Sequence, residues 1–338
     1  MKILVTGGTG YIGSHTVVEL QKKGFEVIIA DNLSNSSIDV VDNIGRITGI
    51  KPLFEKTDLS EQEPAQDLFN RYPGLNSVIH FAAYKAVGES VQQPLKYYRN
   101  NLCSLMNLLR EMESHGIRDI VFSSSCTVYG QPDVLPVTET APIKIAASPY
   151  GNTKQIAEEI ITDVSNVTPL QAILLRYFNP IGAHESALIG ELPMGVPNNL
   201  VPYITQTAIG KRDFLNVWGK DYHTPDGTAI RDYIHVVDIA LAHVTAIERM
   251  LEGKNKQKVE VYNLGTGIGY SVLDVIKSFE RTTMIKLTYK FMERRPGDVE
   301  EIWADTEFAN HELGWKAQRG LDEMTLSAWR WEQRLARL

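Results

Sequence analysis

The first half of the chain alternates short apolar runs with longer stretches in which apolar residues recur every three or four positions. The short runs predict strands, and the longer stretches predict helices. We expect strands near 2–6, 25–31, 51–55, 76–82, 118–124 and 170–177, with helices beginning near 11, 38, 61, 94 and 149. Because strands that alternate with helices form right-handed crossovers, the pattern predicts an α/β fold with a doubly wound parallel sheet.

The pattern changes after about residue 178. Prolines and glycines crowd the stretch 180–197, which predicts long loops. Later helices are expected near 200–210, 235–252, 271–282 and 320–336, and later strands near 215–218, 259–264 and 286–291. We therefore expect a first domain over 1–178 and a smaller, irregular α/β domain over 179–338, with the segments near 235–265 as candidates to return to the first domain.

The first predicted strand ends in a glycine-rich turn. Gly7, Gly10 and Gly13 follow the apolar run, and a helical pattern begins at the same place. Glycines let the backbone approach a pyrophosphate closely, and the free N–H groups of a helix N-terminus attract the anion. Asp31 ends the second apolar run, where an acidic side chain accepts hydrogen bonds from a ribose hydroxyl and repels a 2′-phosphate. This combination predicts a Rossmann fold that binds NAD rather than NADP.

Composition narrows the choice of function. The 338 residues are 43% hydrophobic and 22% charged, which is typical of a folded globular protein. A net charge of -7 argues against a nucleic-acid surface, and no apolar run approaches the length that spans a membrane. The two cysteines fit a reducing compartment, and the eight histidines show no metal-binding spacing. With no apolar signal segment at the start, we expect a cytoplasmic protein without a metal, a nucleic-acid partner or a membrane partner.

A tyrosine and a lysine four residues apart form the candidate reacting pair. Ser148 is suited to cap a helix and Pro149 to occupy its first position, so Tyr150 and Lys154 would project from one helical face. Free tyrosine has a pKa of about 10, and lowering that pKa to neutrality requires about 4 kcal/mol. A lysine ammonium about 6 Å away supplies about 2–3 kcal/mol of this, and a nicotinamide cation can supply the rest. The pair therefore suits removal of a hydroxyl proton while a hydride departs.

The serines before this pair bear on the same chemistry. Ser125 ends a predicted strand, and at that edge of a sheet its hydroxyl can hydrogen-bond a reacting oxygen. Two alternatives without a catalytic role stay open. A Tyr-x-x-x-Lys spacing also arises by chance, and the serines can simply cap the strand and begin its turn. The joint placement of Ser125, Tyr150 and Lys154 favours the catalytic interpretation.

These motifs together resemble the extended short-chain dehydrogenase/reductase family, and the finer resemblance is to its UDP-galactose 4-epimerases. The glycine turn, Ser125, Tyr150 and Lys154 carry the first resemblance. The stretches that carry the second are 79–82, 85–90, 176–180, 197–200, 231–235 and 294–298. The resemblance runs from residue 2 to about residue 330.

The resemblance implies which side chains meet each ligand, with Ser125, Tyr150 and Lys154 as the catalytic residues. NAD would contact Gly7, Gly10, Tyr11, Ile12, Gly13, Asp31, Asn32, Asn35, Ser36, Asp58, Leu59, Phe81, Ala82, Ala83, Lys85, Asn100, Tyr150, Lys154 and Phe178. The nucleotide sugar would be held by Ser125, Tyr150, Asn179, Asn199, Leu200, Asn216, Trp218, Arg231, Arg295, Asp298 and Ile302. Arginines can make forked contacts to a diphosphate, although Arg231 can equally form a surface ion pair and Trp218 can equally lie in the core.

The implied reaction is the reversible epimerisation of UDP-glucose and UDP-galactose at C4′, in galactose metabolism. Tyr150 would take the 4′-hydroxyl proton while hydride leaves C4′ for tightly bound NAD, and the 4-keto sugar would turn over before the hydride returns. A nucleotide-sugar 4,6-dehydratase is one alternative, but such enzymes carry Asp-Glu where this chain has Cys126 and Thr127. A non-catalytic NAD-sensing module is another, although modules of that kind have often lost the tyrosine or the lysine.

Two positions depart from the pattern of the epimerases that the chain resembles. Ile302 stands where a tyrosine or a smaller residue helps to decide whether 2′-acetamido sugars enter, so we expect some activity on UDP-N-acetylhexosamines. Ala83 replaces a glycine beside the nicotinamide, and we expect a small effect. Such enzymes pair the helices that correspond to 94–115 and 149–166 across a dimer axis, so a homodimer is also expected.

Overall fold

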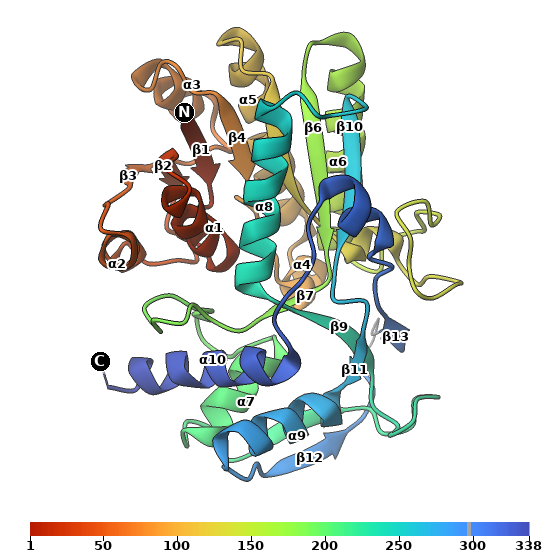
Figure 1. Cartoon of the computed structure of the whole chain (residues 1–338). Coiled ribbons are helices and arrows are strands. Elements are labelled where there is room, and N and C mark those ends of the chain that lie inside the picture. Colours follow the sequence, from red (N-terminus) through yellow and green to blue (C-terminus); the bar gives the residue numbers. More distant parts are fainter. Residues whose placement is uncertain (296–298, 338) are drawn as a thin grey trace.

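The computed structural model describes residues 1–295 and 299–337. The chain forms a larger unit around a central sheet, drawn at the top of Figure 1, and a smaller unit below it. The carboxyl ends of the sheet strands face the smaller unit, which is the edge where open α/β folds bind their ligands.

The central sheet has seven strands in the order β10-β6-β5-β4-β1-β2-β3, and every neighbouring pair is parallel. The strands are β1 (Lys2–Thr6), β2 (Glu26–Asp31), β3 (Leu53–Lys56), β4 (Ser77–His80), β5 (Asp119–Ser125), β6 (Gln171–Tyr177) and β10 (Val259–Leu264). Six of them lie within about three residues of the strands predicted in the first half; five of these six are short, largely apolar runs buried on both faces, and the edge strand β3 is partly exposed. The predicted α/β class with a doubly wound parallel sheet is confirmed.

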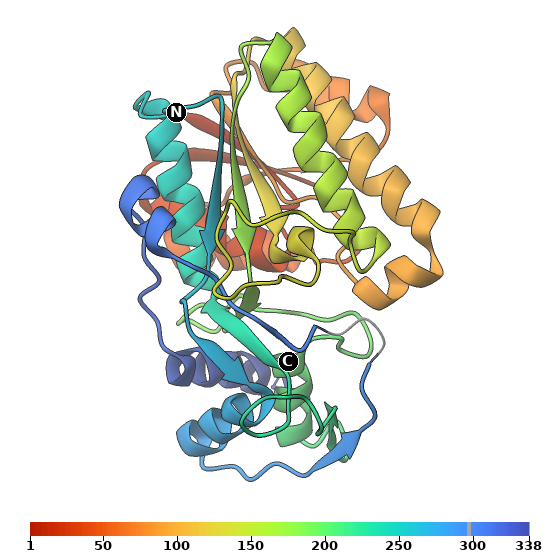
Figure 2. The ribbon, with the colours of Figure 1, turned by 90° about the vertical axis from the view of Figure 1, so that its right-hand side faces the viewer.

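Helices cover both faces of the sheet, as Figure 2 shows. One face carries α1 (Tyr11–Lys22), α2 (Asp39–Thr48) and α8 (Val236–Leu251) over one apolar cluster. The other carries α3 (Gln62–Arg71), α5 (Pro94–Ser114) and α6 (Pro149–Val167) over a second cluster. A short helix, α4 (Val87–Gln92), was not predicted, because six residues are too few to show a helical period.

The smaller unit has its own apolar cluster under three helices, α7 (Leu200–Ala208), α9 (Val272–Thr283) and α10 (Leu321–Leu335). Strands β8 (Leu215–Trp218) and β12 (Tyr289–Met292) form a two-stranded sheet. Four more strands form a second small sheet: β7 (Asn179–Ile181), β9 (Ile230–His235), β11 (Gly269–Ser271) and β13 (Glu301–Ile302). None of these four was predicted, because three of them are only two or three residues long and they lie among glycines and polar residues.

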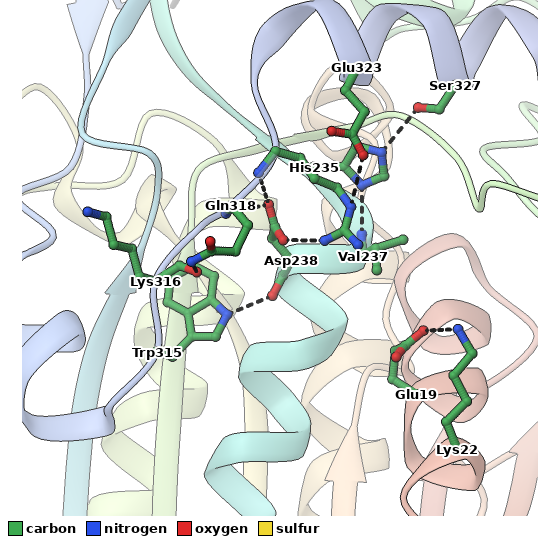
Figure 3. A network of polar contacts seen from close by, with 11 residues as sticks. Glu19, Lys22, His235, Val237, Asp238, Trp315, Lys316, Gln318, Glu323 and Ser327 are labelled. Atoms are coloured by element: carbon green, nitrogen blue, oxygen red, sulfur yellow. Dashed lines mark hydrogen bonds and ion pairs between the residues drawn. The ribbon is translucent and has the colours of Figure 1, made fainter.

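The segment from α8 to β10 belongs in space to the larger unit. Helix α8 packs beside α1, and β10 extends the sheet next to β6. Asp238 at the start of α8 links this segment to the chain that leads into α10 (Figure 3). Its carboxylate accepts hydrogen bonds from the backbone N–H groups of Gln318 (3.1 Å) and Arg319 (3.0 Å). Its backbone oxygen accepts a third hydrogen bond, from the Trp315 indole (3.0 Å). The two units are therefore joined by buried polar contacts as well as by apolar packing.

Candidate active site

The glycine turn connects β1 to α1 in a conformation that glycine alone adopts easily. Gly7 has a φ of +70°, and its N–H donates to the Ala30 oxygen at 2.8 Å. A Cβ on Gly13 would lie 2.3 Å from the Gly7 oxygen, so a side chain there would disrupt the turn. Helix α1 begins at Gly10 with no side-chain cap and no acidic residue in its first turn. Its N-terminal N–H groups are therefore suited to an anion such as a pyrophosphate.

Asp31 lies directly beside this turn, as its place at the end of β2 predicted. Its carboxylate, which is 7% exposed, accepts hydrogen bonds from the N–H groups of Thr9 (3.3 Å) and Leu33 (2.9 Å) and from the Ser36 hydroxyl (3.2 Å). The same side chain thus holds the glycine turn and the loop after β2 together. A carboxylate fixed at this point fits a dinucleotide whose ribose carries free hydroxyls.

The loop after β4 closes the other side of the turn. The N–H of Phe81 donates to the backbone oxygen of Thr6 (3.0 Å), and the N–H of Ala82 donates to the Thr6 hydroxyl (3.3 Å). Asn101 of α5 holds the next part of this loop, because its amide group bonds both backbone groups of Tyr84. Asn101 was missed by the sequence analysis; it also donates to Thr153 of α6 (3.1 Å), which links the loop to the helix with the reacting pair.

Helix α6 begins as the sequence predicted. The Ser148 hydroxyl accepts from the N–H of Gly151 at 3.1 Å, and Pro149 occupies the first helical position. Lys154 is buried, and its amine donates to the backbone oxygen of Ser123 at 2.5 Å. The start of α6 therefore holds the reacting pair against the end of β5.

Ser125 caps the turn after β5 and also contacts Tyr150, so its position is compatible with both of the alternatives that the sequence left open. Its hydroxyl oxygen accepts from the N–H of Thr127 at 3.2 Å, which caps the 3-10 helix after β5. It also makes a side-chain hydrogen bond with the partly buried Tyr150. This hydrogen bond favours the ionised form of Tyr150, and so it lowers the pKa of the phenol. The structure thus brings Ser125, Tyr150 and Lys154 together.

Burial controls the protonation of the reacting pair in the ligand-free protein. It raises the pKa of Tyr150 to about 12, against the lowering effect of the Ser125 hydrogen bond. It lowers the pKa of Lys154 to about 8, against the raising effect of the Glu158 carboxylate. The expected lowering of the phenol pKa by the ammonium is not found in the ligand-free protein: the effects that shift the Tyr150 pKa are burial, Ser125 and Cys126, and removal of either Tyr150 or Lys154 from water disfavours its charged form. A further positive charge beside Tyr150 is needed to bring its pKa toward neutrality.

The other residues implied to contact NAD occupy the carboxyl-end edge of the sheet or the loops beyond it. Phe178 is buried directly after β6, and Lys85 is exposed in the loop before α4. Asn35 is exposed in the loop after β2. The remaining members of the set lie at the start of α1 (Tyr11, Ile12), after β2 (Asn32, Ser36), after β3 (Asp58, Leu59), after β4 (Ala82, Ala83) and in α5 (Asn100). Their contacts with NAD stay predictions.

The residues implied to hold the nucleotide sugar lie in the smaller unit or at its border. Asn179 begins β7, Asn199 and Leu200 are at the start of α7, Asn216 and Trp218 are in β8, Arg231 is in β9, and Ile302 is in β13. The structure places the Arg295 guanidinium 5.9 Å from the centre of the Trp218 ring. It also pairs Ile302 with Arg231 across neighbouring strands. Asp298 lies outside the described residues. The roles of this set stay predictions.

Glu191 was missed by the sequence analysis, although it connects the two predicted ligand sites. Its carboxylate accepts from Asn199 at 2.6 Å and pairs with the Lys85 amine at 3.3 Å. Lys85 belongs to the predicted NAD set and Asn199 to the predicted sugar-nucleotide set. No local pattern in the sequence indicates this bridge, because its partners come from segments far apart in the chain.

Asp232 was also missed. It follows Arg231 in the sequence, but its carboxylate is buried and accepts from the N–H groups of Thr266 (2.8 Å), Gly267 (3.0 Å) and Ala304 (3.2 Å). Asp232 thus holds β9 in place against the loop before β11 and the end of β13. Its neighbour Arg231 is fixed at the border of the two units as a result.

A cavity of about 570 Å³ opens beside β8 and shares Asn216 with the predicted sugar-nucleotide set. Its lining comprises Tyr203, Lys211, Arg212, Asp213, Phe214, Asn216, Lys290 and Met292. The catalytic residues do not line it, so it is not the site of the chemistry. In the described part of the chain, no three His, Cys, Asp or Glu side chains are arranged to hold a metal ion. None of the described helices has both the length and the apolar character needed to cross a membrane.

Comparison with known proteins agrees with this geometry. Residues 4–327 match the family model described as GDP-mannose 4,6 dehydratase. The UDP-glucose 4-epimerase of Bacillus subtilis is 51% identical to this chain, over 98% of the chain and 97% of the relative. The human UDP-glucose 4-epimerase is 48% identical, over 98% of the chain and 96% of the relative.

Solved structures give the same result. The UDP-glucose-4-epimerase from Stenotrophomonas maltophila, solved with bound NAD and formylated UDP-arabinopyranose, has a TM-score of 0.96 and 46% identity, with 100% of this chain and 99% of that chain covered. The enzyme from Bifidobacterium longum, solved with NAD+ and UDP, has a TM-score of 0.94 and 46% identity, with 99% and 98% covered. Together with the Ser125, Tyr150 and Lys154 arrangement, these similarities show that the chain belongs to the UDP-glucose 4-epimerase family.

Proposed function

We propose that this protein is an NAD-dependent isomerase that interconverts UDP-glucose and UDP-galactose at C4′. The observation that carries the proposal is the meeting of Tyr150, Lys154 and Ser125 at the edge of the sheet that also bears the glycine turn. A base for a sugar hydroxyl therefore lies beside a site suited to a dinucleotide. The name shared by the relatives supports the same activity.

The chain's own residues fit NAD as the cofactor. The uncapped N-terminus of α1 would hold the pyrophosphate, and Asp31 would accept hydrogen bonds from the adenosine ribose. When bound, NAD supplies the group that removes a hydride from C4′ and returns it. The structures of relatives solved with NAD support this assignment.

Tyr150 is the proposed acid and base. Its phenol oxygen takes the 4′-hydroxyl proton and later returns it, while the Ser125 hydroxyl hydrogen-bonds the same oxygens. The Lys154 ammonium, fixed to the Ser123 oxygen, stabilises the phenolate through its charge. Because burial keeps the phenol protonated in the ligand-free protein, proton removal begins only once a second positive charge is close by.

The smaller unit would bind the nucleotide part of the substrate. Helix α7 begins without a side-chain cap: the amide nitrogen of its N-cap residue, Asn199, donates to Glu191, and the Asn199 side chain accepts no hydrogen bond from the helix N–H groups. The N–H groups at this N-terminus, together with Arg231 and Arg295, would hold the diphosphate, and Trp218 would stack on the uracil. If UDP is bound tightly and the hexose makes few contacts, the 4-keto sugar can rotate in the site and present its opposite face to the cofactor.

Dehydration is disfavoured by the chemistry of the residues after β5. A 4,6-dehydratase needs an acid and a base there to expel the 6′-hydroxyl. Burial raises the pKa of the Cys126 thiol to about 12, and Thr127 has no ionisable group. An NAD sensor is disfavoured because the tyrosine, the lysine and their supporting contacts are all in place.

The test replaces Tyr150 with Phe. Wild type is expected to convert UDP-galactose to UDP-glucose, and Tyr150→Phe to lower kcat on the order of 10³-fold because the proton has no acceptor. Tyr72→Phe is the matched control, since Tyr72 directly follows α3 and its hydroxyl bonds Glu55 of the edge strand β3. No conversion by wild type would favour the sensor, and a 4-keto-6-deoxy product would favour the dehydratase.

Two further features are part of the proposal. The homodimer would pair α5 and α6 with the same helices of a second copy; Leu95 and Met106 on α5 are 81% and 44% exposed, which supports an apolar contact there. A cytoplasmic location is supported by Cys103 and Cys126, which are both free thiols in the structure.

A further inference from the structure

The face of α6 that carries the reacting pair continues one turn further, to Glu158. Tyr150, Lys154 and Glu158 are spaced four apart, and each contacts one of the last three residues of β5, 123–125. Tyr150 bonds the Ser125 hydroxyl and Lys154 bonds the Ser123 oxygen. Glu158 accepts from the Ser124 hydroxyl at 2.5 Å. The helix and the strand end are therefore joined by three consecutive polar contacts, of which only the first two involve the reacting pair.

Glu158 is held from the other side by Arg176. The guanidinium makes two bonds to the carboxylate, one from Nε at 2.9 Å and one from Nη2 at 2.5 Å. Arg176 lies on β6 directly opposite Ser124 of β5, and it also donates to the Tyr129 hydroxyl at 3.0 Å. Glu158, Arg176 and Ser124 are all 5% exposed or less. A carboxylate with this many fixed partners has one position available to it.

The charges around Lys154 give this carboxylate a second role. The titratable and charged groups that surround the Lys154–Glu158 pair are Tyr150 on α6, His80 on β4, Tyr129 in the 3-10 helix after β5, and Arg176 and Tyr177 on β6. Burial raises the pKa of Tyr129 to about 12, so this phenol is uncharged near neutrality. Burial lowers the pKa of His80 to about 3 and raises the pKa of Tyr150 and Tyr177, so these three are uncharged near neutrality. Within this group Glu158 alone carries a negative charge that favours the ammonium form of Lys154.

We propose that Glu158 is a positioning residue for the reaction: it fixes Lys154 and Ser125 relative to each other and keeps the Lys154 amine charged. The inference rests on the proposed function, since it assigns a role to the neighbour of the proposed catalytic pair. It extends the Tyr-x-x-x-Lys motif by one turn, to Tyr-x-x-x-Lys-x-x-x-Glu, with Arg176 as the partner that holds the added carboxylate.

The first test is Glu158→Gln, which keeps the shape of the side chain and removes its charge. The pKa of the Lys154 amine, measured by carbon-13 NMR in the ligand-free protein, is expected to fall by about one unit. Because Lys154 then loses its proton at lower pH, the alkaline limb of the pH profile of kcat is expected to shift to lower pH by a similar amount. KM for UDP-galactose is expected to change little.

Glu260→Gln is the matched control. Glu260 is 7% exposed, and it also accepts two bonds from one arginine, Arg249 (2.7 and 3.1 Å), and one from a tyrosine, Tyr262 (3.0 Å). It lies near the amino end of β10, at the opposite edge of the sheet from the active site. Both variants are expected to lower the melting temperature, but only Glu158→Gln is expected to move the Lys154 pKa and the alkaline limb.

If Glu158→Gln does not fold, a second pair of variants that perturb the protein less tests the role of Glu158. Ser124→Ala removes only the link between Glu158 and the strand end, and kcat is expected to fall on the order of tenfold because Ser125 is less well placed. Ser165→Ala is its control, since the Ser165 hydroxyl is equally buried on α6 and has no hydrogen-bond partner. Its kcat is expected to match that of wild type.

The outcomes separate the two proposals. If Glu158→Gln and Glu260→Gln lower the melting temperature alike and both leave the Lys154 pKa and the alkaline limb unchanged, the role assigned to Glu158 is wrong. Equal kcat values for Ser124→Ala and Ser165→Ala would likewise overturn it. If wild type has no epimerase activity but the Lys154 pKa still falls in Glu158→Gln, the proposed function is wrong and the link between Glu158 and Lys154 is supported.

Discussion

At the scale of single residues, burial and local polar contacts act against each other in the active site. Burial favours the neutral forms of both Tyr150 and Lys154, while Ser125 and Glu158 favour the charged forms. The balance leaves a phenol that is protonated and an amine that titrates near pH 8 in the ligand-free protein. Such a site is ready for proton transfer only when another positive charge is brought close to the phenol.

Substrate breadth is expected to depend on one residue, Ile302. Ile302 is 5% exposed and packs with Phe178 and Cys126 in an apolar cluster, next to Arg231 on the neighbouring strand. We expect wild type to act on UDP-N-acetylglucosamine, and Ile302→Tyr to lower kcat/KM for that substrate by about tenfold or more, because overpacking costs about 1–3 kcal/mol. The kcat/KM for UDP-galactose serves as the internal control and is expected to change much less. Equal losses on both substrates would contradict this role.

At the scale of elements, the way a helix begins reflects what its N-terminus does. Helix α6 is capped by Ser148, so its first turn is rigid and its side chains are well placed. Helices α1 and α7 begin without a side-chain cap, as do α2, α3, α4, α5 and α10, so the missing cap alone does not mark a binding site. What distinguishes α1 is that its first N–H groups follow the glycine turn, where a pyrophosphate can approach the backbone.

Gly13→Ala tests the glycine turn as an element. The new Cβ would lie 2.3 Å from the Gly7 oxygen, so the turn must open, and we expect the variant to retain much less NAD than wild type after both are purified with NAD present. The unfolding free energy is expected to fall by about 1–3 kcal/mol. Gly88→Ala is the control, because a Cβ at that position of α4 meets no atom within 4 Å. NAD content after purification and chemical unfolding are the measurements; full retention of NAD by Gly13→Ala would contradict the assignment.

At the scale of the whole molecule, the two units share buried polar groups that are neutral. Four histidines, His15, His80, His235 and His243, are buried, and burial lowers the pKa of each from 6.5 to about 3 or 4. They lie on α1, β4, β9 and α8, so they cover the sheet face and the border between the units. Their protonation would place charges throughout the region that joins the two halves.

The pH dependence of stability follows from these histidines. Above about pH 6.5 they are neutral in both the folded and the unfolded chain, and below it the unfolded chain binds more protons. Stability is therefore expected to fall as the pH drops from about 6.5 toward 4, by about 1.4 kcal/mol per pH unit for each such group. Urea unfolding between about pH 7.5 and pH 5 measures the slope, and His243→Gln is expected to reduce it. A stability that stays flat over this range would contradict neutral burial.

The local parts of the site could be predicted from the sequence. The turn at Gly7 to Gly13, Asp31 at the end of β2, and the start of α6 at Ser148 were all found where the sequence placed them. The short strands β9, β11 and β13 were not, because they are held by pairing with each other and by Asp232 rather than by an apolar period of their own. Glu158, Glu191 and Asn101 were missed for the same reason, since Arg176, Lys85 and Thr153, which they contact, lie 18, 106 and 52 residues away in the chain.

By itself, then, the sequence determined the alternation of strands and helices, the glycine turn, and the placement of Tyr150 and Lys154 on one helical face, because each of these depends on residues that are neighbours along the chain. Only the tertiary structure decided that Ser124 lies opposite Arg176, that Glu158 joins them to the reacting pair, and that Glu191 bridges the two ligand sites. Such contacts depend on strand register and on crossovers between distant segments, which no local pattern encodes.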